Sequence, residues 1–484
     1  MTSATAFESE TDQHCSQLFV EYATKADYND TQPEVFPELP EVPQTTALKL
    51  MRRLLASSGL DREHYSTPQW NPLAKLVPAD TRVVIKPNWV LHENLAGHGM
   101  ECLVTHTSVL EAILHYLAKA RPRSVVVGDA PVQICDFALL SEYLGLQSMI
   151  DKFEPAFQRI RIEDFRLVTF LEEGLLRRRE STPRDPSKYV LFDLRAQSEL
   201  EPISQGHDFR VTMYDPRILQ STHGPGRHQY LVAREVIDAD VIINVPKLKT
   251  HKKSGLTAAL KNMVGINGSK DYLPHHRKGG SKDGGDCYVG SSVFKRCAEN
   301  LLDQANTSRS MLMHATYSKL AGLARRSGTV FGNDGNLEGS WYGNDTVWRM
   351  CLDLQRIIHY GSAEGNLQTA PQRRVISITD AIIAGEGDGP LASSPVALGA
   401  MTMGKNVAAL EWVHALMMQL DPRKIPLIDR AFDQHHFPLA QFSPNDIVLS
   451  LNGSNVKLEH LIQKWSVKVR PAEGWIGHCE LAIS

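Results

Sequence analysis

Residues 239–251 give the clearest indication of the fold. Their sequence is Ala239-Asp240-Val241-Ile242-Ile243-Asn244-Val245-Pro246-Lys247-Leu248-Lys249-Thr250-His251. Its apolar, largely β-branched run at 241–245 is typical of a strand that is covered on both faces in a parallel sheet. Pro246 ends this strand, because proline cannot donate to a central ladder of hydrogen bonds. The basic residues that follow therefore stand at the carboxyl end of a buried strand.

Three other segments have the same form, an apolar run that ends in polar residues. Val83-Val84-Ile85 precedes Lys86-Pro87-Asn88, the run 124–128 precedes Asp129, and the run 375–378 precedes Asp380 and the glycine-rich loop 385–390. Helical patterns are expected at about 108–121, 256–264, 345–360 and 406–420. Strand, helix and strand in this spacing form a βαβ unit. The sequence thus predicts an α/β fold with a doubly wound, mostly parallel, Rossmann-like sheet and helices on both faces.

The 484 residues, 42% of them hydrophobic, are enough for one large core. We expect a flexible, proline-rich N-terminal arm at 1–45, an α/β core domain at 46–440 and a C-terminal extension at 441–484. Short alternating runs predict an antiparallel insert at about 155–235, and a helical segment is expected at about 290–360.

Composition excludes several classes of protein. With 52 Lys and Arg against 55 Asp and Glu, the chain has no excess of positive charge that would favour nucleic acid or an anionic membrane surface. It has no long apolar run and no basic N-terminal leader, so we expect a cytoplasmic protein. The seven scattered cysteines form no Cys-x-x-Cys pair, and most are expected to be buried thiols.

Two strand ends carry lysine beside proline. Since ligands of open parallel sheets bind beyond the carboxyl ends of the strands, these lysines are expected to converge on phosphate or carboxylate oxygens. The start of the helix expected at about 256 would add free N–H groups. The predicted substrate-binding residues are Lys86, Asn88, Lys247, Lys249 and Asn262. An ordinary turn and a solvated basic loop are the alternative interpretations.

Two residues near the same strand end are candidates for proton transfer. His251 lies among lysines, whose positive charges would keep the imidazole neutral and available as a base. Lys261 follows on the expected helix. We predict that His251 or Lys261 is catalytic.

Carboxylates also follow the predicted strands. Asp129, Asp380, Glu386 and Asp388 are hard oxygen donors, which Mg²⁺ and Mn²⁺ prefer. They predict a divalent metal site at the same edge of the sheet. Decoration of a glycine-rich turn is the alternative.

Five motifs together resemble a known family. They are 85–88 (Ile-Lys-Pro-Asn), 128–131 (Gly-Asp-Ala-Pro), 239–251, 259–265 (Ala-Leu-Lys-Asn-Met-Val-Gly) and 385–390 (Gly-Glu-Gly-Asp-Gly-Pro). In order and content they resemble the prokaryotic domain-of-unknown-function family 362, from about Arg82 to Asp429. The resemblance implies a fold and a set of characteristic residues. Some relatives carry a ferredoxin module, but the cysteine pattern here predicts no iron–sulfur cluster, and Glu411 stands where the family often has Asp.

These observations predict an enzyme that acts on a small phosphorylated or carboxylated metabolite through a lysine-rich pocket, with a possible divalent metal. A non-catalytic binding or carrier protein for an anionic small molecule or cofactor is the alternative. Nucleic acid and membrane are not expected as partners. The reaction, the substrate and the oligomeric state stay open at this point.

Overall fold

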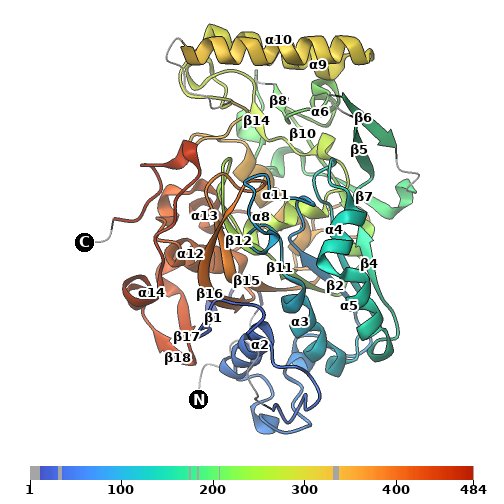
Figure 1. The fold of residues 1–484 in the computed structure, drawn as a ribbon, viewed down its shortest axis with the longest axis vertical. Coiled ribbons are helices and arrows are strands. Elements are labelled where there is room, and N and C mark those ends of the chain that lie inside the picture. The colour runs from blue at the N-terminus through green and yellow to red at the C-terminus, as the bar shows by residue number, and fades with distance from the viewer. Residues whose placement is uncertain are drawn as a thin grey trace.

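The computed structural model describes residues 11–30, 35–173, 176–181, 185–206, 208–330 and 337–482. Its centre is an 11-stranded sheet (Figure 1). The order of its main path is β18 (Ser454–Val456), β17 (Val448–Leu451), β1 (Gln17–Tyr22), β16 (Ser394–Gly404), β15 (Arg374–Glu386), β11 (Val241–Val245), β2 (Arg82–Pro87), β3 (Ser124–Asp129) and β4 (Ile160–Asp164). Off this path, β12 (Lys247–His251) pairs with β15 and with β13 (Gly255–Thr257). The predicted α/β class is confirmed.

Strands β15, β11, β2, β3 and β4 run parallel at the centre of the sheet. Alternate residues of these strands enter two different cores, as Val83 and Val84 do. One core contains α2 (Thr46–Ser57), α3 (Thr107–Ala120) and α5 (Leu146–Phe153), and the other contains α8 (Ala259–Asn262), α11 (Val347–Tyr360) and α12 (Val407–Met417). Helices therefore cover both faces, as predicted.

The order of the central strands defines a switch point. From β2 the chain moves outward through α3 to β3 and then β4, and it returns to place β11 on the other side of β2. A crevice beyond the carboxyl ends of the strands forms where the order reverses in this way, and ligands of such folds bind there.

Small antiparallel sheets lie outside the main sheet, as the alternating runs predicted. They are β7 (Tyr189–Asp193) with β10 (Arg227–Ala233) and β9 (His223–Gly224), β14 (His276–Arg277) with β8 (Phe209–Arg210), and β5 (Val168–Glu173) with β6 (Leu176–Ser181). Strand β4 falls in the expected insert but joins the main sheet beside β3.

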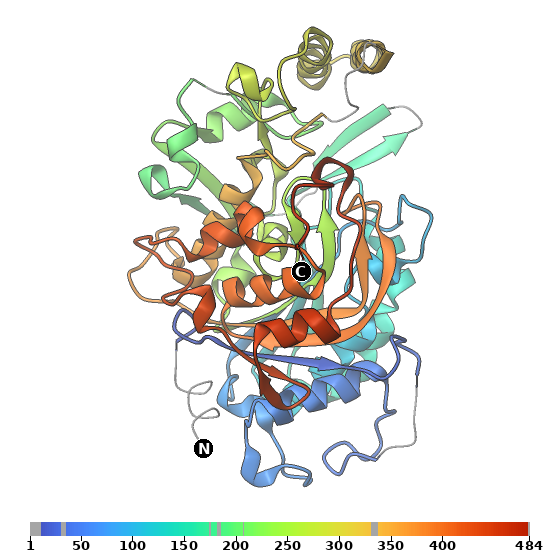
Figure 2. The same cartoon turned by 90° about the vertical axis from the view of Figure 1, so that its left-hand side faces the viewer.

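The remaining helices surround these sheets. They are α4 (Phe137–Leu144), α6 (Pro216–Thr222), α7 (Arg234–Ile237), α9 (Val293–Thr307), α10 (Met311–Val330), α13 (Pro426–Asp429) and α14 (Leu458–Trp465). Helices α9 and α10 form a hairpin at one end of the molecule, seen end-on in Figure 2. Within the described ranges, no helix is long and apolar enough to cross a bilayer.

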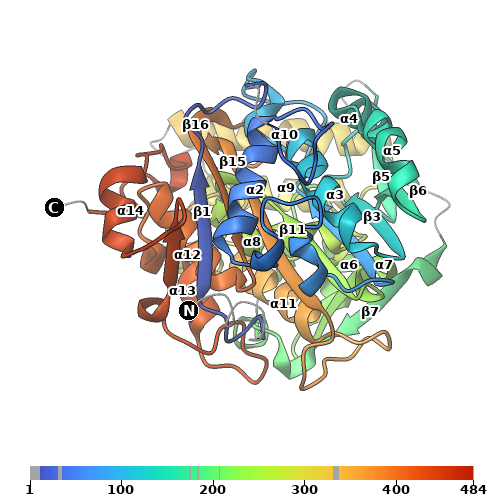
Figure 3. The same cartoon turned by 90° about the horizontal axis from the view of Figure 1, so that it is seen from below.

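Both ends of the chain differ from the expected arm and extension. Strand β1 is buried along its whole length, antiparallel to β16 and parallel to β17 (Figure 3). The described part of 1–45 therefore includes a strand of the sheet, because the apolar residues of β1 fit between two strands from the far end of the chain. The segment 441–484 supplies β17 and β18 to the same sheet.

The basic segment after Pro246 is a strand rather than a loop. Residues 247–251 form β12, because β15 continues for 13 residues and pairs with Lys247 and Lys249, while β13 pairs with 249–251. The helix expected at about 256–264 begins later, at Ala259, and consists of α8 and the 3₁₀ turn Met263–Ile266 that directly follows it. Strand β13 lies between β12 and this helix start, so the N–H groups of the helix do not follow directly on the lysines as expected.

Candidate active site

A cavity of about 370 Å³ lies at the switch point. Half of the residues in its wall come from the carboxyl ends of β2, β3 and β13 and from the segments after them, in the ranges 88–90, 129–134 and 257–265. Segment 211–214 and His275 close another side. The site thus lies where the order of the strands predicts a ligand.

A buried ion pair lies beneath this cavity. Lys86 Nζ is 2.8 Å from Asp129 Oδ1 and donates to the carbonyl of Pro87 at 2.7 Å. The Asp129 carboxylate also accepts from the backbone N–H groups of Trp89 at 2.6 Å and Ala130 at 2.7 Å. Burial raises the pKa of Asp129, and the Lys86 ammonium opposes this rise. Both charged groups have their hydrogen-bonding capacity taken up by the protein.

Asparagines tie the ion pair to β11. Asn262 Nδ2 donates to the carbonyl of Lys86 at 3.0 Å and to Asn244 Oδ1 at 2.8 Å, and Asn262 Oδ1 accepts from Asn88 Nδ2 at 3.1 Å. These bonds fix the orientation of the amides. Asn88 Oδ1 is buried without a partner, and Asn88 lines the cavity, so this oxygen can accept from a ligand.

The ion pair requires glycine at position 265. A Cβ atom there would lie 1.9 Å from Asp129 Oδ1 and 2.8 Å from Lys86 Nζ. Gly265 also accepts from the backbone N–H of Ala130 at 2.8 Å. The segment after α8 can pass this close to the ion pair only without a side chain.

Four lysines line the cavity, namely Lys252, Lys253, Lys261 and Lys270. In the part of the chain that the structure describes, the ammonium groups of Lys261 and Lys270 make no hydrogen bond and no ion pair. Burial lowers the pKa of Lys261, and it lowers that of Lys270 to about 7 and that of Lys253 to about 8. Within the described ranges, Lys261 and Lys270 therefore bring positive charge to the cavity without an ion-pair partner, although Glu338 in the wall raises the pKa of Lys253 and Asp129 raises that of Lys270.

Two imidazoles in the cavity wall have opposite hydrogen-bonding states. His251 Nδ1 accepts from the backbone N–H groups of Lys253 at 3.0 Å and Ser254 at 3.1 Å, which leaves the proton on Nε2. His275 Nδ1 donates to the carbonyl of Leu273 at 2.6 Å, which leaves a lone pair on Nε2. Burial lowers the pKa of both rings well below the usual value, so both are neutral. His251 Nε2 is thus a hydrogen-bond donor, whereas His275 Nε2 is the ring nitrogen that can accept a proton.

Lys247 was predicted to bind substrate and Asp380 to bind a metal, but neither residue lines the cavity. They form a second buried ion pair with a separation of 2.6 Å. Tyr28 donates to Asp380 Oδ1 at 2.6 Å and accepts from Lys247 Nζ at 2.7 Å, and the backbone N–H of His106 donates to Asp380 at 3.0 Å. Both side chains are fully buried, and burying a charged group is costly unless a group of opposite charge lies beside it. Lys247 and Asp380 therefore stabilise each other's charge. The prediction that Lys86 and Lys247 converge on one pocket is therefore wrong, because each lysine belongs to a separate ion pair.

Three further predicted residues also lie elsewhere. Lys249 is buried and donates to the carbonyl of Leu103. Glu386 Oε2 accepts from the backbone N–H of Arg470 at 2.8 Å, and Asp388 Oδ1 accepts from that of Glu473 at 2.9 Å. These two carboxylates hold the C-terminal segment. Because Asp129 and Asp380 are each paired with a lysine, the four predicted carboxylates do not gather around one cation.

The predicted site residues do not include Lys253, Lys270 and His275, which also line the cavity. Asn88, Asp129, His251, Lys261 and Asn262 were predicted and line the cavity. The polar segment 270–278, with two histidines and two lysines close to the Lys261-Asn262 motif, is the signal that points to the missed part. Glu411 does not line the cavity, and its Oε2 accepts from the backbone N–H of Leu260 at 3.2 Å.

Comparison with known proteins agrees with the resemblance seen in the motifs. Residues 193–415 match the family described as "Domain of unknown function (DUF362)". The chain therefore contains a DUF362 domain in this range, which includes β11, β12, α8 and β15 but not the predicted motifs at 85–88 and 128–131.

Two individual proteins are similar to parts of the chain. A "Thylakoid-associated protein" of Synechocystis sp. is 25% identical over 195 residues, which are 40% of this chain and 37% of that protein. The chain thus spans well under half the length of this curated relative. A crystal structure from Thermotoga maritima is 12% identical, with a TM-score of 0.31, and covers 71% of this chain and 56% of that one.

We predict that Gly265→Ala destabilises the protein. The added methyl group would overlap Asp129 and push it from Lys86, so the free energy of unfolding should fall by about 3 kcal/mol, the upper end of the usual cost of overpacking. Differential scanning fluorimetry would show this as a lower Tm.

Gly322→Ala is the matched control. A Cβ at Gly322 of α10 meets no atom within 4 Å, so alanine there should leave the Tm unchanged or raise it slightly. An equal effect of the two substitutions would contradict the role of Gly265 in seating the ion pair.

Proposed function

We propose that this protein is an enzyme that binds a small phosphorylated or carboxylated molecule in the cavity at the switch point and moves a proton on it. The observation that carries the proposal is the combination, in one cavity, of two unpaired ammonium groups with a neutral imidazole whose lone pair is free. The anion-binding lysines in this proposal are Lys261 and Lys270, with Lys253 beside them.

Electrostatics supports an anionic ligand. A buried ammonium group without a partner costs free energy, and the depressed pKa of Lys270 and Lys253 reflects that cost. Lys261 lowers the pKa of both of them further by repulsion. A phosphate or carboxylate between these side chains would offset the repulsion, and lysine binds such groups as a point charge.

The rest of the wall supports a ligand with an apolar part. Trp89, Ile134, Phe170 and Leu391 line the cavity together with the lysines. Pockets for small molecules commonly combine apolar walls with a few polar groups that fix orientation. The anionic group would bind at the lysines and the remainder of the molecule against these side chains.

The two imidazoles support proton transfer beside a carbonyl. His251 Nε2–H would donate to a carbonyl oxygen of the ligand, and His275 Nε2 would accept a proton from the neighbouring carbon. Each ring is held in its tautomer by the backbone and needs no rearrangement to act. This is the chemistry of enolisation, which isomerases and lyases share.

The proposal gives no metal-binding role to Asp380, Glu386 and Asp388, because none of them lines the cavity, Asp380 is paired with Lys247, and Glu386 and Asp388 accept from the backbone of the C-terminal segment. A carrier protein for the same kind of anion is the second candidate, since the lysines alone suffice for binding. Catalysis depends on His275, so experiments on this residue separate the two.

We predict that Lys261→Met and Lys270→Met each weaken the binding of sulfate at least tenfold. Each substitution removes a buried ammonium that would face the anion, and one tenfold change corresponds to about 1.4 kcal/mol. Isothermal titration calorimetry with sulfate and pyrophosphate measures the effect. Lys282→Met, which removes an exposed lysine, is the control and should bind both anions like the wild type. Unchanged affinity in both cavity variants would contradict the anion site.

Sulfate binding should weaken as the pH rises through 7. Lys270 has a pKa of about 7 because of burial, with Asp129 raising it and Lys261, Lys86 and Arg166 lowering it. Sulfate favours the charged form, so binding takes up protons above this pH, and the affinity falls by as much as about tenfold per pH unit. Calorimetry in buffers with different ionisation enthalpies measures the uptake, which Lys270→Met should reduce. An affinity independent of pH between 6 and 9 would contradict this prediction.

We predict that His275→Gln abolishes turnover while sulfate affinity stays unchanged. The wild type should exchange C–H protons next to the carbonyl of 2-oxo acids or phosphorylated ketones with D₂O, as followed by proton NMR. Loss of a general base lowers such rates by about 10²–10⁴. If the wild type binds these probes without any exchange, the carrier function replaces the enzymatic one.

A further inference from the structure

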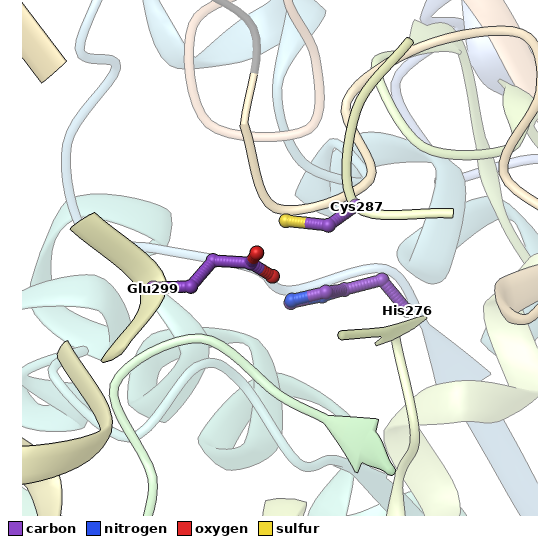
Figure 4. Close-up of side chains that lie close together, drawn as sticks. All are labelled: His276, Cys287 and Glu299. Carbon is purple, nitrogen blue, oxygen red and sulfur yellow. The ribbon is translucent and has the colours of Figure 1, made fainter. Parts of the chain in front are cut away.

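A second group of functional side chains lies outside the cavity. His276, Cys287 and Glu299 are all buried, and their nearest ligand atoms lie within 4.8 Å of one another (Figure 4). Their exposed fractions are 5%, 0% and 6%. Among the residues that the structure describes, this is the group of three or more His, Cys, Asp and Glu side chains that is close enough to hold one metal ion.

A tightly folded loop brings the three residues together. His276 lies on β14, Cys287 follows a glycine-rich turn, and Glu299 lies on α9. A Cβ at Gly285 in this turn would lie 2.2 Å from the carbonyl oxygens of Lys278 and Gly279, so the turn closes only with glycine there. The chain thus uses a demanding local conformation to set Cys287 opposite His276.

The group has buried polar atoms that nothing in the structure satisfies. His276 Nδ1 and Glu299 Oε2 are both buried without a hydrogen-bond partner. Glu299 Oε1 accepts from the backbone N–H of Gly279 at 3.0 Å, and Cys287 Sγ accepts from that of Glu338 at 3.1 Å. Backbone bonds of this kind orient carboxylate and thiolate ligands of a metal.

A small cavity beside the group provides the space. It has a volume of about 30 Å³ and is lined by all three side chains. A cavity holds one water from about 10–15 Å³, so this one accommodates an ion and a water molecule. Arg210 and Lys278 also line it, but both pair with Asp303.

We propose that His276, Cys287 and Glu299 bind one Zn²⁺ ion, with water as the fourth ligand. A tetrahedral zinc site with bonds of about 2.0–2.3 Å would place the ligand atoms about 3.3–3.8 Å apart, so the side chains need to close in by about 1 Å. Imidazole, thiolate and carboxylate are the ligand types of zinc, whereas a thiolate disfavours Mg²⁺ and Mn²⁺.

Charge supports a divalent ion. A thiolate and a carboxylate together balance the two positive charges, so the loaded site is neutral and can remain buried. Without a cation, burial raises the pKa of Cys287 and of Glu299 and lowers that of His276, so each group is driven to its uncharged form. Zinc binding would reverse this for the two acids and release their protons.

The place of the site indicates what the ion would do. Segment 211–214 and Glu338 line both the small cavity and the main one, and His275 of the main cavity directly precedes His276. The ion would fix the wall that carries His275 without entering the main cavity. The zinc site itself stands independently of the proposed function, because none of its ligands belongs to the anion site.

Cobalt substitution tests the proposal. The full-length protein, purified, stripped with a chelator and titrated with Co²⁺, should bind one ion per chain and show the visible bands of tetrahedral Co²⁺ together with a near-ultraviolet cobalt–thiolate band. Zn²⁺ should displace Co²⁺ and remove these bands. Cys287→Ser should abolish the thiolate band, and Glu299→Gln should lower the affinity at least tenfold.

Cys297→Ser is the matched control, because Cys297 is exposed on the same helix as Glu299 and should keep every band. If Cys287→Ser fails to fold, the titration of Glu299→Gln decides the matter. A wild-type protein that binds no Co²⁺, or that shows an octahedral spectrum without a thiolate band, would overturn the zinc site. Sulfate binding would be unaffected by that result, so the two proposals fail separately.

Discussion

Burying an ammonium group inside a protein costs free energy unless oxygen atoms surround it, and this constraint shapes the centre of the molecule. Two lysines at strand ends meet it in the same way, Lys86 with Asp129 and Lys247 with Asp380. The first pair sets the position of Asn262 and excludes a side chain at Gly265. With both pairs satisfied, Lys261 and Lys270 remain without an ion-pair partner among the described residues of the cavity, and the proposed anion site rests on them.

Much of the fold was predictable, since it follows from the apolar runs of the chain. The runs beginning at Val83, Val125, Val241 and Val375 are parallel neighbours in the sheet. The pairing of these charged residues was not predictable, because the partners lie far apart in sequence. A lysine at a strand end has the same local sequence pattern whether its ammonium group contacts a ligand or an aspartate. The roles of Lys247 and Asp380 were misassigned for this reason.

Local pattern also failed to distinguish the two histidines of the cavity. His251 and His275 differ through the backbone groups that meet their Nδ1 atoms, N–H groups in one case and a carbonyl in the other. That difference depends on the course of the chain after each residue. It reverses donor and acceptor in the ring, so only the three-dimensional structure shows that His275 Nε2, and not His251 Nε2, has the lone pair that the proposed function uses.

Strand β1 has a consequence for how the protein is made. Its partners are β16 and β17, so Leu18 pairs with Gly404, and Gln17 pairs with Val448. During translation this apolar segment emerges from the ribosome long before β16 and β17, the two strands with which it pairs. An unpaired strand of this kind is open to aggregation, and contacts of such sequence separation slow folding. The nascent chain therefore has a long interval in which a chaperone that shields apolar segments would protect it.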